Sequence, residues 1–158
     1  MPEPSLHRIR LRAPWQCQFS PRDPDPVDPL PPIEFSIRRS SDWQSWRHLP
    51  CPGQLTVGRS FRRPTGLSSS HRVDLIVDVG LGGFEIDLNG QSLTDCRDPS
   101  AVGDDFPLGQ RYEITSILEH QNRLRIRLDL ETSSGLEDWM VNEDGADPLQ
   151  VCLVIREG

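Results

Sequence analysis

Apolar residues recur at every second position in six separate segments of this chain, and that spacing restricts the fold more than any other feature of the sequence. Alternation of this kind is typical of a β-strand that buries one face and leaves the other in water. The segments are residues 6–13, 33–37, 73–79, 84–88, 123–130 and 149–156. The one helical signal, at residues 114–118, is long enough for one or two turns. We therefore expect an all-β protein, built as an antiparallel sandwich or barrel.

Turn signals separate these segments. Asn89-Gly90 supplies the two positive-φ positions of a type I′ turn and predicts a hairpin between residues 84–88 and 91–93. Residues 21–32 contain six prolines in twelve positions, which excludes a helix or an inner strand there. We expect an extended, proline-rich surface loop; docking of this segment on an SH3 or WW groove is the alternative. All 158 residues are expected to form one domain.

The charge of the chain excludes several function classes. Its 17 basic residues are all arginine, and its 24 acidic residues give a net charge of −7. Without lysine there is no P-loop or Schiff-base chemistry, and the acid surplus argues against nucleic-acid binding. No apolar run approaches about 20 residues, so no membrane span is predicted. The first residues lack the apolar stretch of a signal peptide, so we expect a cytoplasmic protein whose four cysteines are reduced thiols.

No catalytic or metal-binding arrangement can be assembled from the sequence. The four histidines lie far apart, and neither His-Glu-x-x-His nor Cys-x-x-Cys occurs. The acidic residues between positions 137 and 147 do not have the spacing of an EF-hand loop. We therefore predict no catalytic residue, no metal ligand and no cofactor, so the protein is not expected to be an enzyme. A structural calcium ion held by loop carboxylates is the alternative that stays open.

Several stretches occur in an order that carries a family resemblance. They are Trp46 with Leu49-Pro50, FRRP at 61–64, residues 73–93, Phe106-Pro107, YEIT at 112–115 with Leu118, and NRLRIRL at 122–128, with residues 9–15 and 149–157 as the first and last strands. Together they resemble the sugar-binding jelly-roll domain at the N-terminus of family-two glycoside hydrolases, a member of the galactose-binding-like sandwiches. The resemblance covers about three quarters of the chain and implies an antiparallel two-sheet jelly-roll sandwich with one short helical turn at 114–118. Asn122 is expected to turn the chain into the next strand in left-handed geometry.

The resemblance implies a non-catalytic binding module, because the family's catalytic carboxylates lie on a separate barrel domain. The expected ligand is a carbohydrate, with a role as a protein-interaction or structural subunit as the alternative. Trp43 and Trp139 are the candidate stacking platforms, and Asp138 and Asp144 the candidate acceptors of sugar hydroxyl hydrogens. Trp15 is expected to pack in the core instead.

A rival resemblance comes from a second ordered set of residues. Gly58-Arg59, Ser68 with His71, and Asn89-Gly90 stand in the order found in forkhead-associated domains, which are phosphothreonine-reading sandwiches. That resemblance implies that Arg59 and Ser68 hold a phosphate.

Three arginines, Arg123, Arg125 and Arg127, share one face of a predicted strand. We expect a solvated outer sheet face rather than an anion site, because acidic residues on neighbouring strands can neutralise it. Those residues are Asp74, Asp78, Glu85 and Asp87.

Overall fold

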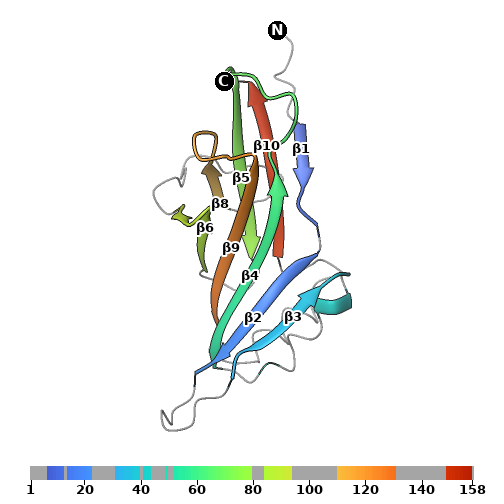
Figure 1. Ribbon diagram of the computed structural model, residues 1–158, viewed down its shortest axis with the longest axis vertical. Helices are drawn as coiled ribbons and strands as arrows, with labels where there is room; N and C mark the ends of the chain where they lie inside the picture. The colour runs from blue at the N-terminus through green and yellow to red at the C-terminus, as the bar shows by residue number, and fades with distance from the viewer. Residues whose placement is uncertain are drawn as a thin grey trace.

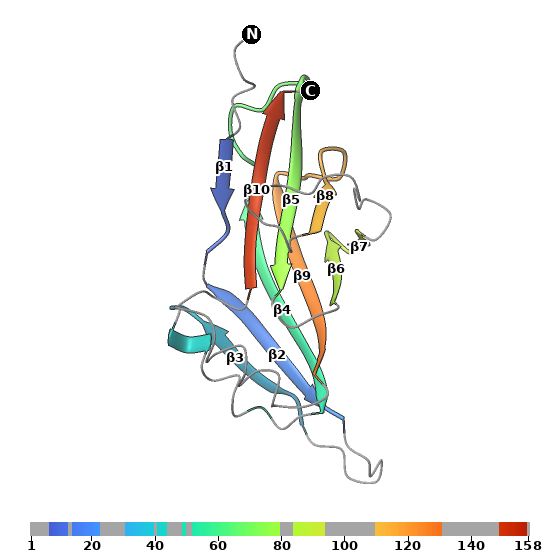
Figure 2. The same ribbon diagram turned by 180° about the vertical axis from the view of Figure 1, so that it is seen from behind.

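Two antiparallel sheets stacked face to face make up the molecule (Figures 1 and 2). The computed structural model describes residues 7–12, 14–22, 31–39, 41–43, 49, 52–79, 84–93, 110–130 and 149–157. The four-stranded sheet has the order β1 (His7–Arg10), β10 (Leu149–Glu157), β5 (His71–Val79), β8 (Gln110–Glu113). The six-stranded sheet has the order β3 (Ile33–Ile37), β2 (Trp15–Pro21), β4 (Gly53–Arg62), β9 (Gln121–Leu130), β6 (Phe84–Leu88), β7 (Gln91–Ser92). The predicted all-β, two-sheet sandwich is confirmed.

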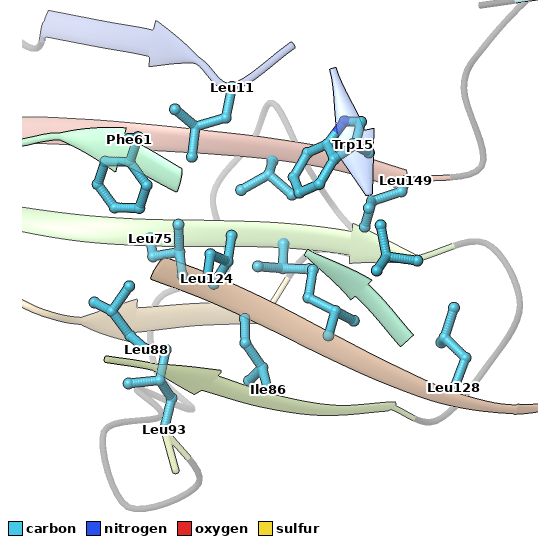
Figure 3. Packing of buried hydrophobic residues seen from close by; sticks show 14 of the residues in the cluster. Leu11, Trp15, Phe61, Leu75, Ile86, Leu88, Leu93, Leu124, Leu128 and Leu149 are labelled. Carbon is cyan, nitrogen blue, oxygen red and sulfur yellow. The ribbon is translucent and has the colours of Figure 1, made fainter. Parts of the chain in front are cut away.

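The core lies between the two sheets and is filled by every second residue of the strands (Figure 3). In β9 the alternation is complete, with Leu124, Ile126 and Leu128 buried and the arginines between them facing outward. Leu75 of β5 approaches the same core from the opposite sheet. Each such side chain contributes about 1.5–3 kcal/mol when fully buried, so this apolar layer is the main force that holds the sheets together.

Strands β2 and β4 were not predicted, although β2 shows the expected alternation of buried and exposed residues. In β4, glycines at 53 and 58 and the charged Arg59 interrupt the apolar pattern and obscure the strand. The glycine at 53 has a packing role, since a Cβ there would lie 2.3 Å from Cζ of the Phe19 ring. Glycine thus allows the fully buried Phe19 to lie against β4.

The N-terminal segment changes sheets. β1 pairs with β10, and the N–H of Leu11 extends that contact by donating to the carbonyl of Val151 at 2.9 Å. From Trp15 onward the chain is β2, which pairs with β3 and β4 in the other sheet. The strand predicted at 6–13 is therefore shorter, and the chain crosses from one sheet to the other between Leu11 and Trp15. Most of the proline-rich loop, residues 23–30, lies outside the described residues.

The predicted type I′ hairpin is confirmed, with φ values of 55° at Asn89 and 81° at Gly90.

The expectation for Asn122 is wrong: it lies inside β9 with a buried side chain and has no positive φ. Its Oδ1 accepts hydrogen bonds from Asn89 Nδ2 at 3.0 Å and from the N–H of Glu119 at 2.8 Å. Asn122 therefore fastens the turn at 114–119 to the hairpin. Within that turn the N–H of Leu118 donates to the carbonyl of residue 114, as expected for one short helical turn.

The outer face of the four-stranded sheet is not fully exposed to solvent. Ile76, Cys152 and Val154 point away from the main core, yet they form a second cluster of buried residues. The alternation at residues 73–79 and 149–156 does not predict this second cluster, because the three residues stand among the outward-facing positions of their strands. Burial raises the pKa of the Cys152 thiol, and neither Cys152 nor Cys17 is part of a disulfide. The other two cysteines, at 51 and 96, lie outside the described residues.

Candidate functional site

A polar hollow of about 370 Å³ crosses the outer face of the six-stranded sheet. The strand order β3-β2-β4-β9 brings together side chains that are far apart in the sequence. The outward positions of these strands supply amides, hydroxyls, one carboxyl group and two guanidinium groups. The lining residues of this polar hollow are Gln16, Cys17, Gln18, Glu34, Thr56, Gly58, Arg59, Ser60, Arg123 and Arg125.

The floor and walls of the polar hollow are set by the strand positions. Gly58 presents no side chain in the middle of the floor. Gln16 is held in place because its Oε1 accepts a hydrogen bond from the hydroxyl of Ser36 at 2.9 Å. Glu34 on β3 and Arg123 on β9 stand on opposite sides, with β2 and β4 between them. The hollow therefore offers hydrogen-bond acceptors at one end and a cation at the other.

Ion pairs neutralise part of the arginine face, as predicted. Arg125 Nε lies 3.1 Å from Asp87 Oδ2, and Arg127 lies 3.2 Å from Glu85, each across the β6–β9 pairing. Arg123, on the same face, has no ion pair with any described residue. It is the cation of this row that is left to meet a ligand in the polar hollow.

Asp74 takes no part in neutralising that face, because it lies on the other sheet. Its carboxylate is 1 % exposed, accepts a hydrogen bond from Arg156 Nε at 2.9 Å and forms an ion pair with Arg111, whose Nε lies 3.2 Å away. Its strand, β5, lies between β10 and β8, so this single carboxylate connects three strands. The prediction of Asp74 and Asp78 as counter-ions of the β9 arginines is wrong, because both lie on β5 in the other sheet.

Arg59 has an inward position in β4, unlike the other arginines of the sheet. Its guanidinium carbon lies 5.7 Å from the centre of the Trp15 ring, which is a cation–π distance. Its Nη1 atom is buried and has no hydrogen-bond partner among the described residues, and burial lowers the pKa of Arg59. A buried guanidinium group with an unpaired N–H lowers the stability of the fold unless a hydrogen-bond acceptor reaches it.

The phosphate-reading arrangement is not assembled. Ser68 Oγ lies 2.9 Å from His71 Nδ1, and the backbone N–H of Ser68 donates to the same nitrogen. These contacts close the turn between β4 and β5. Arg59 instead packs on Trp15 within the sandwich, so the structure does not gather the residues of that rival reading.

The structure tests only some of the site residues that the sequence predicted. Trp43 is 3 % exposed and packs in the core, so it presents no stacking face at the surface. Its 3₁₀ turn is held by Asp42, whose carboxylate accepts hydrogen bonds from two backbone N–H groups at 2.8 and 3.0 Å. Those bonds lower the pKa of Asp42. Trp15 is in the core, as predicted. Trp139, Asp138 and Asp144 lie outside the described residues and stay predictions.

The polar hollow was missed at the sequence level, because its residues come from four strands whose order the pattern does not reveal. Within the described ranges, no three histidine, cysteine or acidic residues come close enough together to hold a metal ion. In the same ranges, no helix is long and apolar enough to cross a membrane.

Comparison with known proteins gives a likeness of fold. No protein-family model matches the chain, and no curated protein matches its sequence. Among solved structures, the β-glucuronidase of Bifidobacterium dentium, complexed with coumarin-3-O-glucuronide, matches with a TM-score of 0.60 and 19% identity over 98% of this chain. The β-D-glucuronidase of Dictyoglomus thermophilum matches with a TM-score of 0.54 and 14% identity over 99% of this chain. A β-glycosidase from Bacteroides vulgatus matches with a TM-score of 0.51 and 17% identity over 94%.

These matches concern only a part of each enzyme. The chain spans 30%, 29% and 20% of the three solved chains, respectively. The predicted resemblance to a sandwich domain of family-two glycosidases is thus confirmed for the fold. The chain has the β-sandwich of a small part of these larger glycosidases.

Proposed function

We propose that this chain is a non-catalytic binding module for carbohydrate and that the polar hollow is its binding site. The observation that carries the proposal is the lining of the hollow, where amide, hydroxyl and carboxyl groups converge on one sheet face. Sugars expose many hydroxyl groups, each of which donates and accepts hydrogen bonds, so a lining of mixed donors and acceptors suits them. The likeness in fold to glycosidases supports a ligand of this class.

The charges of the hollow favour an acidic sugar. Arg123 has no ion pair with the described residues, and a guanidinium group binds a carboxylate through two parallel hydrogen bonds. Glu34 and the amide of Gln18, on the opposite side, would accept and donate hydrogen bonds to ring hydroxyls. A uronic acid placed across β2 and β4, with its carboxylate at Arg123, meets both requirements.

The proposal excludes hydrolysis in the polar hollow on chemical grounds. Glycosidic bond cleavage ordinarily uses two carboxyl groups, about 5–10 Å apart, on either side of the bond. Glu34 is the one carboxyl group among the described residues that line the hollow. A single carboxylate can accept hydrogen bonds from a ligand, but it cannot divide the acid and nucleophile roles. Recognition without cleavage is therefore the proposed activity.

A glycan array containing neutral and uronic-acid oligosaccharides tests this function, followed by calorimetric titration of the best ligand. We expect Glu34→Gln and Arg123→Gln each to weaken binding, the second selectively for acidic sugars. Arg72→Gln on the other sheet is the matched control, since Arg72 is exposed and pairs with Glu113, away from the hollow. Silence across the whole array, or equal loss in the control, would refute the proposal.

A second candidate is a structural or protein-interaction role. It is favoured by the observation that similar sandwiches are parts of larger chains. A chain that binds no glycan on the array, yet sediments as a stable complex with a partner chain, would point to this role.

A further inference from the structure

A second cavity, of about 450 Å³, opens at the seam between the two sheets, where the N-terminal segment crosses from one sheet to the other. One wall is the end of β1 and the start of the crossing, and the other is the end of β4. We call this cavity the seam groove. Its lining residues are Ile9, Arg10, Leu11, Arg59, Ser60, Phe61, Arg62, Pro64, Gln121 and Leu153.

The β4 wall of the seam groove is an unpaired strand edge. β9 pairs with β4 as far as Arg62, whereas β2 pairs with it only as far as Gly58. The N–H of Arg63 donates to the carbonyl of His120 at 3.0 Å, so the odd-numbered residues here direct their backbone groups toward β9. Ser60 and Arg62 therefore direct their N–H and C=O groups toward the groove, where the described part of the chain provides no partner.

The crossing of the chain explains why this edge stays open. If β2 continued backward in register, Pro14 would lie opposite Ser60, but β2 begins only at Trp15. Proline has no N–H to donate to a strand partner, and the preceding residues belong to the crossing and to the other sheet. The chain thus leaves a vacant strand position beside β4. An open edge of this kind is a template for another strand.

The charge of the seam groove selects the kind of strand that fits. In a chain with a net charge of −7, the lining includes Arg10, Arg59 and Arg62 and no acidic residue. The buried Nη1 of Arg59, which lacks a hydrogen-bond partner within the described ranges, gives a second reason to expect an anionic acceptor. Apolar residues, Leu11 and Phe61 among them, make up half of the lining and suit alternate apolar residues of a bound strand.

We propose that the seam groove binds an extended acidic peptide from a partner protein, which adds as a strand to the β4 edge at Ser60 and Arg62. Each of these two residues contributes one N–H and one C=O to the new pairing. Because side chains alternate along a strand, apolar residues of the peptide face the sandwich, while its carboxylates face outward, on the side of the exposed Arg62. Arg59 and Ser60 line both cavities, but the two proposals can be tested separately, since Arg10 and Arg62 line only the seam groove, whereas Glu34 and Arg123 line only the polar hollow.

Three short peptides test the proposal on the full chain. The probe is acetyl-Val-Glu-Val-Glu-Val-amide. Its binding is measured by nuclear magnetic resonance titration of the protein's backbone amides. The first control replaces glutamate by lysine, and the second keeps the sequence but carries N-methyl groups on alternate backbone nitrogens. We expect the acidic probe to shift the amide signals of Ser60 and Arg62. Its binding should weaken as added salt screens the charges. N-methylation removes strand hydrogen bonds and is expected to weaken binding by about tenfold or more.

Two matched variants separate the groove from general attraction between charges. Arg62→Gln is expected to weaken the acidic probe by about two- to fivefold, as for an exposed ion pair. Arg127→Gln, at a half-buried position on the neighbouring β9, is expected to leave binding unchanged. Failure of the acidic probe to bind wild-type protein overturns the proposal. So does equal binding of the N-methylated probe, or equal weakening by both variants, because each would show attraction without strand addition.

Discussion

Removing the carboxylate of Asp74 is expected to destabilise the sandwich more than removing any acidic side chain on the arginine face. Asp74 is 1 % exposed, and its two partners, Arg111 and Arg156, are 21 % and 36 % exposed. Asp74→Ala leaves both guanidinium groups without their counter-ion. It thereby removes the contacts that connect β5 to its two neighbouring strands, β8 and β10. Breaking a buried pair by deleting one partner costs about 3–5 kcal/mol. Because Arg156 can be rehydrated, we expect the lower end of that range, about 3 kcal/mol.

Two other carboxylates provide a graded comparison. Asp87 has one partner, Arg125, which is 50 % exposed, so Asp87→Ala is expected to cost about 1 kcal/mol. Glu85 is 74 % exposed beside Arg127, so Glu85→Ala is expected to cost about 0–0.5 kcal/mol. The expected order of destabilisation is therefore Asp74, then Asp87, then Glu85. It follows burial and the number of partners rather than distance, since the Arg–carboxylate distances are all about 3 Å.

Urea unfolding at pH 7, followed by tryptophan fluorescence, measures the three free energies of unfolding. With a slope of about 2 kcal/mol per molar urea, Asp74→Ala lowers the midpoint by about 1.5 M. Asp74→Asn, which keeps one acceptor oxygen, is expected to fall between wild type and Asp74→Ala. The reasoning is refuted if Asp74→Ala costs no more than Glu85→Ala while both variants unfold with the wild-type slope.

Three further predictions test local features of the fold. Gly53→Ala is expected to cost about 1–3 kcal/mol in the same urea assay, because its Cβ would meet the Phe19 ring, and Phe19→Leu in the same chain should recover part of that loss. Two backbone hydrogen bonds hold the pKa of Asp42 below that of an ordinary aspartate, so these bonds stabilise the fold above about pH 4 and are lost as the pH falls through the folded-state pKa. The stability difference between wild type and Asp42→Asn should therefore shrink in acid, and a pH-independent difference would contradict this. Burial of Cys152 and Cys17 predicts that iodoacetamide labels them, in peptide mass spectrometry, only after urea is added, and rapid labelling of the native chain would contradict it.

Local patterns predicted the strands whose alternation is uninterrupted. In β9 and β6 each apolar residue faces the core, and the Asn89-Gly90 turn fixes the hairpin because few other residues adopt its positive φ values. The alternation of apolar residues fails to predict a strand where tertiary packing, rather than strand periodicity, determines which residue stands at a position. Gly53 and Arg59 lie inside β4 for tertiary reasons: one makes room for a ring, and the other lies on the face of Trp15.

The candidate sites were harder to predict than the strands. Trp43 was chosen as a stacking platform for its residue type, but its place in the core depends on the turn that Asp42 holds. The polar hollow combines Gln16, Glu34 and Arg123, and their proximity follows from strand order. Period-two spacing tells which face a residue occupies but not which strands are neighbours. A site built across four strands is therefore invisible until the pairing is known.

The antiparallel pairing of the first and last strands has a mechanical consequence. His7 lies opposite Ile155, so the outer end of β1 and the outer end of β10 meet at the same place. A force pulling these two ends apart would load the interstrand hydrogen bonds one after another, as in opening a zip, instead of all at once. The first strand should peel away at low force, and the tension would then pass through the crossing between Leu11 and Trp15 to the six-stranded sheet. The two layers would thus yield in sequence, beginning with the smaller one.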